Sequence, residues 1–403
     1  MSILKGKHIL LAVTGSIAAY KAADLASKLT QAGALVDVLL SPAAEKFVSP
    51  LTFQSVTGRK AFTDADLWGG EAHILHVGLG QGADLLVVAP ATASTLAKMA
   101  HGIADNLVSI TALAARGPIL AAPAMDVGMF EHPATQENVR ILRERGVHFA
   151  GPDEGRMASG LVGRGRFVEP AELLGHIRLV LGLGGKLAGM RIVVTAGGTQ
   201  EPLDPVRVLT NKSSGKQGYA LAQAALDAGG TVSLVSAPTA LPSPVGAKII
   251  SVGTAQEMLE AVLAESAEAD ALLMAAAPAD FRPKKAARDK LKKRDGIPQV
   301  ELEPAPDILE TIAGSGSRKP RIVIGFAAES RDLLENAESK LKAKSLDMIV
   351  ANDISAPDAG FGVDTNRVTL LYADGRREAL PLMSKEQVAE SIVERLAEFL
   401  ETR

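Results

Sequence analysis

The feature that most constrains the fold is a pattern that recurs along the first 150 residues: an apolar run, a turn of small residues, and a helical segment. The apolar runs have the length and the β-branched content of buried strands. Strands separated by helical segments imply a parallel, doubly wound sheet. The expected strands are residues 7–13, 35–40, 84–89 and 118–122, with a short fifth at 147–150.

The turns that follow these strands predict where a ligand binds. In doubly wound sheets, ligands lie beyond the carboxyl ends of the strands. The turns at 14–16, Ser41, 90–94 and 123–126 all occupy that position. We expect them to converge on one crevice.

The same pattern restarts at residue 190, after a glycine cluster at 182–185 that is typical of a linker. We therefore predict two doubly wound, mostly parallel α/β domains of the flavodoxin-like or Rossmann-like type, 1–182 and 190–403, joined by a glycine-rich linker at 183–189. The second domain is expected to contain strands near 191–195, 231–236, 271–274, 321–325 and 348–350, a hairpin of 367–372 and 377–380, and a closing helix from 384.

The stretch 191–230 predicts an anion site. A strand and the turn Gly197-Gly198-Thr199 are followed by Asn211-Lys212-Ser213-Ser214-Gly215-Lys216, directly before a helical run at 219–228. Unpaired backbone N–H groups at a helix start attract phosphate. The spacing is not that of a Walker A loop. The alternative interpretation is an ordinary strand-to-helix turn with a serine N-cap.

Composition narrows the class of protein. Lys+Arg 43 against Asp+Glu 46 gives a net charge of −3, which argues against a general nucleic-acid binder. Aromatic residues make up only 3% of the chain, and no apolar run reaches the length of a membrane span. The chain contains no cysteine, which excludes disulfides and thiolate metal sites. We expect a cytoplasmic α/β enzyme without nucleic-acid or membrane partners.

The two halves differ in their ionisable residues. All seven histidines lie before residue 182, so the second domain works without imidazole. It has instead a basic stretch at 282–294, with eight basic residues and one acid. This stretch is a solvated loop, a nucleic-acid patch or a mobile clamp over a polyphosphate, and the lack of aromatic residues favours the clamp.

Specific motifs occur in both halves. The second half contains EPLDPVRVLTNKSSGKQG, AAAPADFRP, PAPDIL, GFAAES and ANDI, and the first half contains TGSIAAYK, APATASTLAKMAHGIADNL, PAMD and HPAT. Over nearly its full length the chain resembles the bacterial bifunctional coenzyme A biosynthesis proteins. These join a phosphopantothenoylcysteine decarboxylase to a phosphopantothenate–cysteine ligase.

For the second domain the resemblance implies a CTP-dependent ligase. CTP activates the carboxylate of 4′-phosphopantothenate as an acyl-cytidylate with release of pyrophosphate, and the amine of cysteine then attacks the acyl carbon. Mg²⁺ and lysines would suppress repulsion between the anions, although the sequence does not identify the metal ligands. Asn211 is implied in the acyl-cytidylate stage. Nucleotide contacts are implied for Ala276, Asp280, Lys290, Ala305, Pro306, Asp307, Ile308, Phe326, Lys340 and Lys344, and substrate contacts for Arg207, Ser213, Ser214 and Gly215.

Simpler interpretations exist for single residues of this set. Phe326 is equally compatible with a core position. Lys340 and Lys344 are spaced to lie on one helix face, where both would reach the nucleotide or both would be solvated.

For the first domain the resemblance implies bound FMN and decarboxylation to 4′-phosphopantetheine. His76 is implied as the catalytic base. His73 precedes it by three residues, but without cysteine or a nearby carboxylate cluster a metal pair is not expected. Contacts to the FMN phosphate and ribityl chain are implied for Gly15, Ser16, Ser41, Thr92, Ala93 and Ser94.

Two catalytic positions depart from the family pattern. Asp126 replaces the usual asparagine, and Ser159 replaces the cysteine that donates the last proton. Because a hydroxyl is a much weaker acid than a thiol, an alternative is an active ligase with a weak or altered decarboxylase half. The substrate carboxylate is expected to avoid Asp126 and to face the loop that carries Arg156, Arg164 and Arg166.

Two rival classes are less compatible with the sequence. A nicotinamide oxidoreductase would need G-x-G-x-x-G after a strand, and Gly15 stands alone there. A nucleic-acid binder would have to use residues 282–294. The family resemblance further implies small-molecule substrates and a homo-oligomer, with ligase dimers and flavin-domain trimers.

Overall fold

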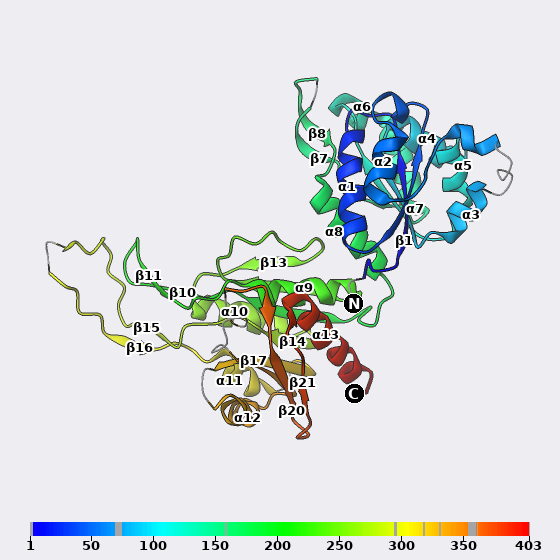
Figure 1. Cartoon of the computed structure of the whole chain (residues 1–403). Coiled ribbons are helices and arrows are strands. Elements are labelled where there is room, and N and C mark those ends of the chain that lie inside the picture. The colour runs from blue at the N-terminus through cyan, green and yellow to red at the C-terminus, as the bar shows by residue number, and fades with distance from the viewer. Residues whose placement is uncertain are drawn as a thin grey trace. The chain divides into compact units, whose positions relative to one another are not determined.

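The computed structural model describes residues 3–68, 75–157, 159–293, 296–316, 319–329, 332–353, 360 and 362–402. His73 and Arg294, which the sequence singled out, lie outside these residues. The chain divides into two compact units, Met1–Leu181 and Gly182–Arg403. Each unit is a sheet with helices against it, so the predicted α/β fold class is confirmed (Figure 1).

The first unit contains a parallel six-stranded sheet in the order β3-β2-β1-β4-β5-β6. All five predicted strands are present, and β3 was not predicted, because Ala61 and Phe62 are flanked by the polar residues Lys60 and Thr63 rather than lying in an apolar run. The strands are β1 (His8–Val13), β2 (Leu35–Leu40), β3 (Ala61–Phe62), β4 (Leu85–Ala91), β5 (Ile119–Pro123) and β6 (His148–Phe149).

Helices cover both faces of this sheet, because buried apolar side chains of β1 point alternately to one face and to the other. Ile9 and Leu11 pack into a core with α1, α2 and α8, while Leu10 and Ala12 pack into a second core with α3, α4, α5 and α7. The helices are α1 (Ala19–Gln31), α2 (Pro50–Thr57), α3 (Leu75–Gly82), α4 (Ala93–His101), α5 (Leu107–Ala114), α6 (Val127–Glu131), α7 (Pro133–Glu144) and α8 (Pro170–Gly182), with 3₁₀ turns at Ala44–Lys46 and Asp64–Trp68.

The segment 151–166, which was expected to be a loop, is a hairpin. Its strands β7 (Asp153–Arg156) and β8 (Val162–Arg166) pair antiparallel. The backbone of Gly165 accepts a hydrogen bond from the N–H of Met125 at 3.0 Å, and a Cβ at Gly165 would overlap the carbonyl of Met125. Glycine therefore lets this hairpin dock against the turn after β5, a contact that glycine content alone does not predict.

The second unit contains an eight-stranded sheet in the order β13-β12-β9-β14-β17-β18-β20-β21. The first six strands are parallel, and the predicted hairpin β20–β21 adds two antiparallel strands at the edge. Only β13 was not predicted. The strands are β9 (Arg191–Ala196), β12 (Thr231–Ser236), β13 (Lys248–Ser251), β14 (Ala271–Met274), β17 (Ile322–Glu329), β18 (Met348–Asp353), β20 (Val368–Tyr372) and β21 (Arg377–Ala379).

Helices lie on both faces of this sheet as well. α9 packs on β9 and β12 and against α13, while α10, α11 and α12 contribute to a core on the other face. α9 begins three residues before the predicted helix, and its N-cap is Gly215 (φ 76°), so the alternative of a serine N-cap is wrong. The helices are α9 (Lys216–Asp227), α10 (Ala255–Ser266), α11 (Ile308–Ala313), α12 (Leu333–Ala343) and α13 (Lys385–Thr402).

Two antiparallel ribbons project from the second unit as an arm (Figure 1). They are β10 (Gln200–Pro202) with β11 (Val208–Thr210), and β15 (Phe281–Pro283) with β16 (Leu302–Pro304). The basic stretch begins in β15 and is tied to the first ribbon, since the N–H of Leu291 donates to Asp204 at 3.1 Å. A further small ribbon joins β19 (Thr365–Asn366) to β22 (Met383–Ser384).

The glycine cluster between the two sheets lies against the second unit. Gly182 and Gly185 approach the backbone of residues 226–228 so closely that a Cβ at either would clash. Leu187 is fully buried, and its N–H donates to Ala228 at 2.8 Å. Within the described residues, none of the helices combines the length and the apolar character that a membrane crossing needs.

Candidate active sites

The first candidate site is a cavity of about 1040 Å³ beyond the carboxyl ends of β1, β2, β4 and β5. The turns after these strands converge there, as the sequence predicted. The predicted residues that line it are Gly15, Ser16, Ser41, Thr92, Ala93, Ser94, Asp126 and Ser159.

Buried contacts hold the turns of this cavity together. The hydroxyl of Thr14 donates to the carbonyl of Pro90 at 2.7 Å and accepts the N–H of Thr92 at 3.1 Å, which joins the turn after β1 to the turn after β4. Thr92 also caps α4. A Cβ at Gly15 would overlap Ala43, so glycine is required where these turns meet.

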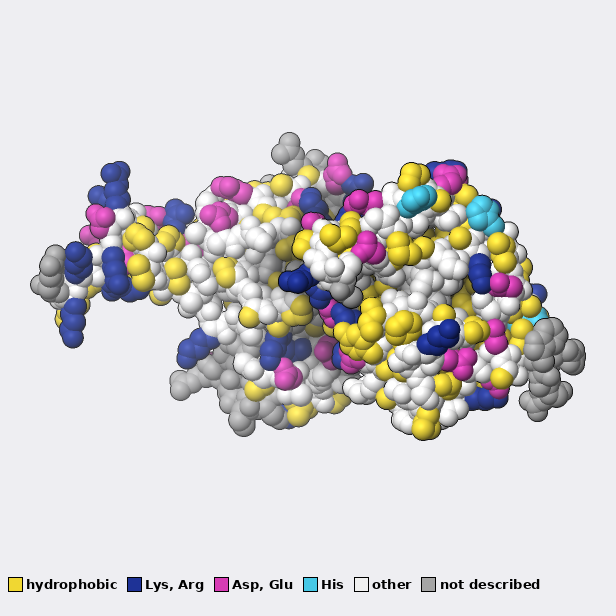
Figure 2. Space-filling view, turned by 90° about the horizontal axis from the view of Figure 1, so that it is seen from above, with side chains coloured by type: hydrophobic (Ala, Val, Ile, Leu, Met, Phe, Trp, Pro, Cys, Tyr) yellow, Lys and Arg dark blue, Asp and Glu magenta, His cyan; other side chains and the backbone are white. Residues whose placement is uncertain are grey.

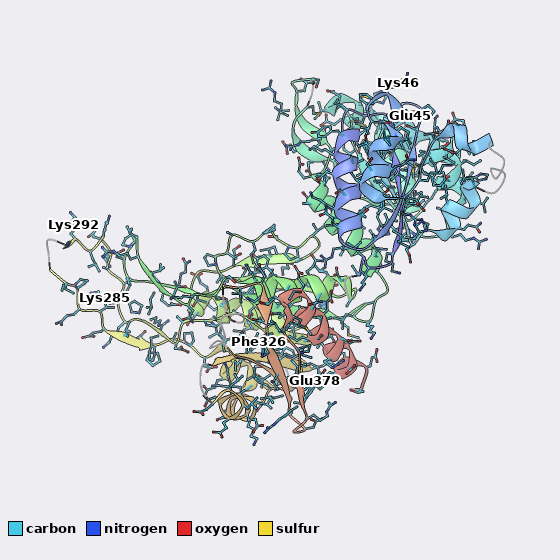
Figure 3. All side chains as sticks on the ribbon, in the orientation of Figure 1. Glu45, Lys46, Lys285, Lys292, Phe326 and Glu378 are labelled. Atoms are coloured by element: carbon cyan, nitrogen blue, oxygen red, sulfur yellow. The ribbon has the colours of Figure 1, made fainter. Side chains whose placement is uncertain are left out.

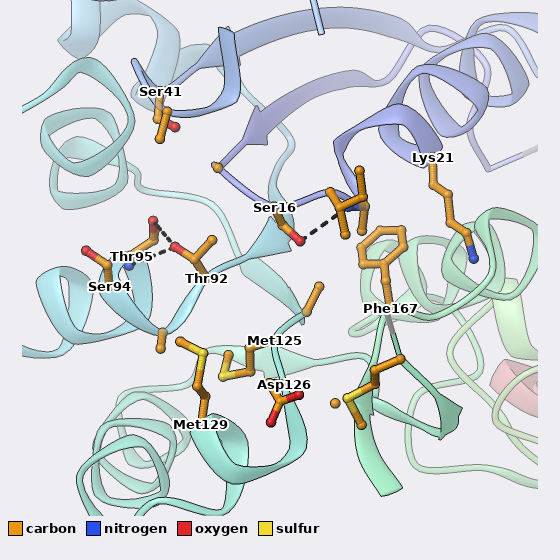
Figure 4. A pocket seen from close by; sticks show the side chains of 18 of the residues that line it. Ser16, Lys21, Ser41, Thr92, Ser94, Thr95, Met125, Asp126, Met129 and Phe167 are labelled. Atoms are coloured by element: carbon orange, nitrogen blue, oxygen red, sulfur yellow. Dashed lines mark hydrogen bonds between the residues drawn. The ribbon is translucent and has the colours of Figure 1, made fainter. Parts of the chain in front are cut away.

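The lining suits a flavin nucleotide. Figure 4 shows Ser16, Ser41, Thr92 and Ser94 around the cavity, with Met125, Asp126 and Met129 below them in the view. Hydroxyls and the start of α4 can bind a phosphate, while methionine and aromatic surface can cover an apolar ring system. The residues present therefore fit the predicted cofactor.

Three cations that line this cavity, Lys21, Lys98 and Arg166, are paired with neighbouring carboxylates. Glu169 accepts from Lys21 at 2.7 Å and from Arg166 at 2.5 Å, and Lys98 pairs with Asp105 at 2.8 Å. The bond from Lys21, and then that from Arg166, holds the pKa of Glu169 below its usual value. Among the described lining residues, Arg156 is the cation that has no carboxylate partner.

The two residues that depart from the family pattern contact each other. The hydroxyl of Ser159 donates to the carboxylate of Asp126 at 2.5 Å. Asp126 is also the N-cap of α6, where it accepts the N–H of Gly128 at 3.1 Å. The two departures therefore form one hydrogen-bonded pair, which the sequence did not reveal.

His76 lies on α3 and does not line this cavity among the residues that the structure describes. Its Nδ1 is buried and has no hydrogen-bond partner in that described part of the chain. Arg156 and Arg166 line the cavity, whereas Arg164 lies over the ring of Phe130. The predicted base is thus not brought to Asp126 and Ser159 within one chain.

The second candidate site is a cavity of about 770 Å³ between the start of α9 and the carboxyl ends of β14, β17 and β18. Most of the predicted ligase residues meet there. These are Asn211, Ser213, Ser214, Gly215, Ala276, Asp280, Ala305, Pro306, Asp307, Ile308, Phe326 and Lys340.

The start of α9 is set close to the sheet by small residues. A Cβ at Gly218 would lie 2.6 Å from the Cβ of Ala196, so a larger residue would push α9 away from β9. Opposite, the amide of Asn211 donates to the carbonyls of Ala277 at 3.2 Å and Pro278 at 3.0 Å. These two bonds fix the side chain that was implied in the acyl-cytidylate stage.

The predicted lysine pair divides between two environments. Lys340 lines the cavity and donates to the carbonyl of Phe326 at 3.0 Å. Lys344 does not line it and pairs with Asp307 at 2.8 Å and Glu310 at 3.0 Å. Asp307 raises the pKa of Lys344, and although burial opposes ionisation of Asp307, Lys344 keeps the pKa of that carboxyl below its usual value.

Two predicted residues lie on the arm. Arg207 donates to the carbonyl of Leu291 and pairs with Asp204 at 3.2 Å. Neither Arg207 nor Lys290 lines the second cavity as the described residues form it. Figure 3 shows the neighbouring Lys285 and Lys292 far out on the arm, well away from Phe326.

Other lining residues had no role assigned by the family resemblance, among them Lys216, which belongs to the predicted anion site, and Lys385 and Asn352, which the sequence analysis did not assign to any site. Lys216 and Lys385 begin α9 and α13, and Asn352 lies in the ANDI motif, which was noted without assigning a role. The Oδ1 of Asn352 is buried without a partner in the described residues. Those residues contain no cluster of three or more His, Cys, Asp or Glu that could hold a metal ion.

The fold and the cavities define an α/β protein with two separate ligand sites, one rich in hydroxyls and one rich in lysines. Residues 2–181 match the Flavoprotein family, and residues 187–400 match the DNA/pantothenate metabolism flavoprotein C-terminal domain. These matches support a flavin cofactor in the first unit.

The chain is 45% identical over 398 residues to the coenzyme A biosynthesis bifunctional protein CoaBC of Bacillus subtilis (strain 168), covering 98% of both chains. It is 42% identical over 408 residues to that of Mycobacterium tuberculosis (strain H37Rv), covering 98% and 97%. A crystal structure of a CoaBC C-terminal domain is 40% identical, with 55% of this chain and 100% of that chain covered and a TM-score of 0.47.

The chain therefore belongs to the family of bifunctional coenzyme A biosynthesis proteins, as its motifs predicted. It is an enzyme with a flavoprotein decarboxylase half and a ligase half, and the predicted function is confirmed. The alternative of a weakened decarboxylase gains no support from these relatives.

Proposed function

We propose that the two cavities carry the two reactions separately. Residues 1–182 would bind FMN and convert 4′-phosphopantothenoylcysteine to 4′-phosphopantetheine and carbon dioxide. Residues 190–403 would form that substrate from 4′-phosphopantothenate, cysteine and CTP. The observation that carries this proposal is the gathering of the residues implied for each activity around its own cavity.

The experiment is to give the purified protein phosphopantothenate, cysteine and each nucleoside triphosphate, and to follow pyrophosphate and carbon dioxide separately. We expect both products with CTP. Pyrophosphate without carbon dioxide would contradict the role of the first cavity, and carbon dioxide only from added phosphopantothenoylcysteine would contradict that of the second.

In the first cavity, Ser16, Ser41 and Thr92 would hold the cofactor. When bound, the flavin takes up and returns the electrons exchanged with the thiol-bearing carbon of the substrate. Arg156 supplies a cation to the substrate carboxylate, because this side chain lines the cavity and has no acidic partner among the described residues. Asp126 would orient the substrate while it holds Ser159 in place.

In the second cavity, Asn211 would donate to an acyl oxygen as the acyl-cytidylate forms, and the start of α9 would receive phosphate. We propose that Mg²⁺ enters with the phosphates of CTP, since this ion is usually held by one or two carboxylates plus substrate phosphates. Asp280 and Asp307 are the lining carboxylates that could share it.

The chain would act as a homo-oligomer in the cytoplasm, ligase dimers and flavin-domain trimers being the assemblies that the family resemblance implies. The arm supports the dimer, because Val206, Val208, Phe281 and Leu302 are 62%, 43%, 54% and 52% exposed on it. Figure 2 shows hydrophobic side chains interspersed with lysine and arginine on the arm. An exposed apolar strip of this kind is typical of an interface.

Association would also explain the predicted residues that lie outside the cavities. Arg207 and Lys290 on the arm would reach the ligase cavity of a second copy, and His76 would reach the flavin cavity of a neighbouring copy. Mixing an Asn211→Asp protein with a Lys290→Gln protein tests this. Mixed dimers should recover ligase activity, and a mixture no more active than its parts would show that each chain uses its own residues.

A further inference from the structure

Two lysines meet at the end of the ligase cavity where α9 begins. Lys216 is the first residue of α9, and Lys385 is the first residue of α13. The packing of α13 against α9 brings both side chains to the cavity lining. Neither is among the residues that the family resemblance assigned to the nucleotide or the substrate.

Lys385 is a buried cation. It is only 6% exposed, and its ammonium donates to the carbonyls of Gly360 at 2.8 Å and Val363. Both acceptors are neutral, and burying an ammonium without a carboxylate costs free energy. Burial, and then the charge of Lys216, lower the pKa of Lys385, because both disfavour the charged ammonium.

The carboxylate that pairs with Lys216 faces solvent. The side chain of Asp364 is 86% exposed and pairs with Lys216 at 2.5 Å. One exposed carboxylate thus serves two lysines, so the cavity side keeps an excess of positive charge. The N–H groups in the first turn of α9 add to it.

Neutral hydrogen bonds keep this arrangement in place. Gln217 donates to the carbonyl of Lys385 at 3.2 Å and accepts from Asn366 at 3.0 Å. The start of α13 is therefore tied to the first turn of α9 by neutral groups, and Asp364 is the one acid of the described residues that pairs with either lysine.

We propose that Lys385 binds a substrate phosphate group in the ligase cavity, together with Lys216 and the start of α9. The proposal rests on the proposed ligase function and adds a binding residue to it. The phosphate belongs either to the triphosphate of CTP, whose leaving pyrophosphate would then sit here, or to phosphopantothenate. A phosphate fits because it accepts several hydrogen bonds at once and carries the charge that the lysines lack.

The test is the affinity of the purified full chain for inorganic pyrophosphate, measured by titration calorimetry. Lys385→Met should weaken binding by roughly 10- to 150-fold, the range of a lost charge-assisted hydrogen bond. Lys385→Arg, which keeps the charge, should stay within about fivefold of the parent. Lys248→Met, on the surface and paired with Glu265, is the matched control and should leave binding unchanged.

A variant that is expected to tighten pyrophosphate binding distinguishes a role in binding from a role in folding. Asp364→Asn frees Lys216 from its exposed partner and should tighten pyrophosphate binding by about two- to fivefold. If these residues only maintain the fold, losing an ion pair gives unchanged or weaker binding, and that result overturns the proposal. The Asp364→Asn measurement therefore tests the proposal even if Lys385→Met does not fold.

The source of the phosphate follows from the KM values of folded Lys385→Met. A raised KM for CTP with weakened pyrophosphate binding assigns Lys385 to the triphosphate. A raised KM for phosphopantothenate alone assigns it to the substrate's phosphate. Unchanged KM values and pyrophosphate affinity overturn the proposal, whereas a parent protein that binds pyrophosphate but never produces it contradicts the ligase function instead.

Discussion

The two cavities occupy the same place in two similar sheets, yet they handle charge in opposite ways. In the first, the cations Lys21 and Lys98 are paired with carboxylates, and hydroxyls provide the polar lining. In the second, Lys385 is buried and forms no ion pair with an acid of the described residues. The difference teaches that one doubly wound fold can form a hydroxyl-rich ligand site in which most cations are paired, or a lysine-rich site with a buried cation.

Charge pairing away from the cavities serves stability, and breaking it should have the largest effect. Asp37 is 6% exposed, accepts two bonds from Arg59 at 2.7 and 2.9 Å, and accepts a third from His8. Asp37→Asn should lower the free energy of unfolding of the first unit by about 2–3 kcal/mol. Denaturation at pH 7, followed by circular dichroism, measures this.

The pH dependence of that loss has a definite sign. Burial opposes ionisation of Asp37, but Arg59 and His8 outweigh it and lower its pKa. A lowered carboxyl pKa stabilises the fold above the unfolded pKa, about 3.9, and this contribution disappears as the pH falls through the folded value. Parent and variant should therefore converge in stability at acid pH. An equal difference at pH 7 and pH 3 would contradict the assignment.

An effect of similar size is expected when Lys290 on the arm is replaced, and it concerns the formation of the acyl-cytidylate from CTP. A lysine that contacts a triphosphate contributes about 2–3 kcal/mol, so Lys290→Gln should slow acyl-cytidylate formation by roughly 30- to 150-fold. Asn211→Asp should instead impair handling of the acyl intermediate. Single-turnover release of pyrophosphate and formation of phosphopantothenoylcysteine separate the two steps. The same loss in both variants, confined to CTP affinity, would refute this division.

Lys340 and Lys344 test whether the cavity lining decides function. Lys340 faces the cavity, so Lys340→Gln should raise the KM for CTP by roughly 10- to 30-fold. Lys344 is held by Asp307 and Glu310, and Lys344→Gln should raise it by less than about fivefold. Steady-state kinetics of both variants give the comparison, and equal effects would show that Lys344 also reaches the nucleotide.

The smallest effect is expected at Asp126. An ionised Asp126 about 4 Å from the substrate carboxylate would cost on the order of 4 kcal/mol at an effective dielectric of 20, so we expect that carboxylate to face Arg156. Asp126→Asn should then keep carbon dioxide release within about tenfold of the parent. A gain of 100-fold or more would show that Asp126 and the substrate carboxylate do lie together.

The sequence predicted what depends on local pattern and missed what depends on distant contacts. Every long parallel strand was found, because apolar runs between helices have few other solutions. β3, with two residues, and the hairpin β7–β8, with alternating glycines and arginines, carry no such signal. The contact between Ser159 and Asp126, 33 residues apart, is likewise a product of tertiary packing.

The residues of the candidate sites likewise divide into those that local sequence patterns predicted and those that depend on tertiary packing. Residues directly after strands, such as Ser16 and Ser41, were predicted and line the first cavity. Lys385 was missed, because the start of a C-terminal helix acquires its place only when α13 packs on α9. His76 and Lys290 were named through family motifs, and motifs carry no information on which copy of the chain a residue serves.

The central claim is that two separate cavities carry two separate reactions, and the full-length His76→Asn variant tests it most directly. Given phosphopantothenate, cysteine and CTP, this variant should release pyrophosphate at the parent rate, accumulate phosphopantothenoylcysteine, and lose carbon dioxide release by at least 100-fold. Parent-like carbon dioxide release, or a fall in pyrophosphate together with carbon dioxide, would contradict the account.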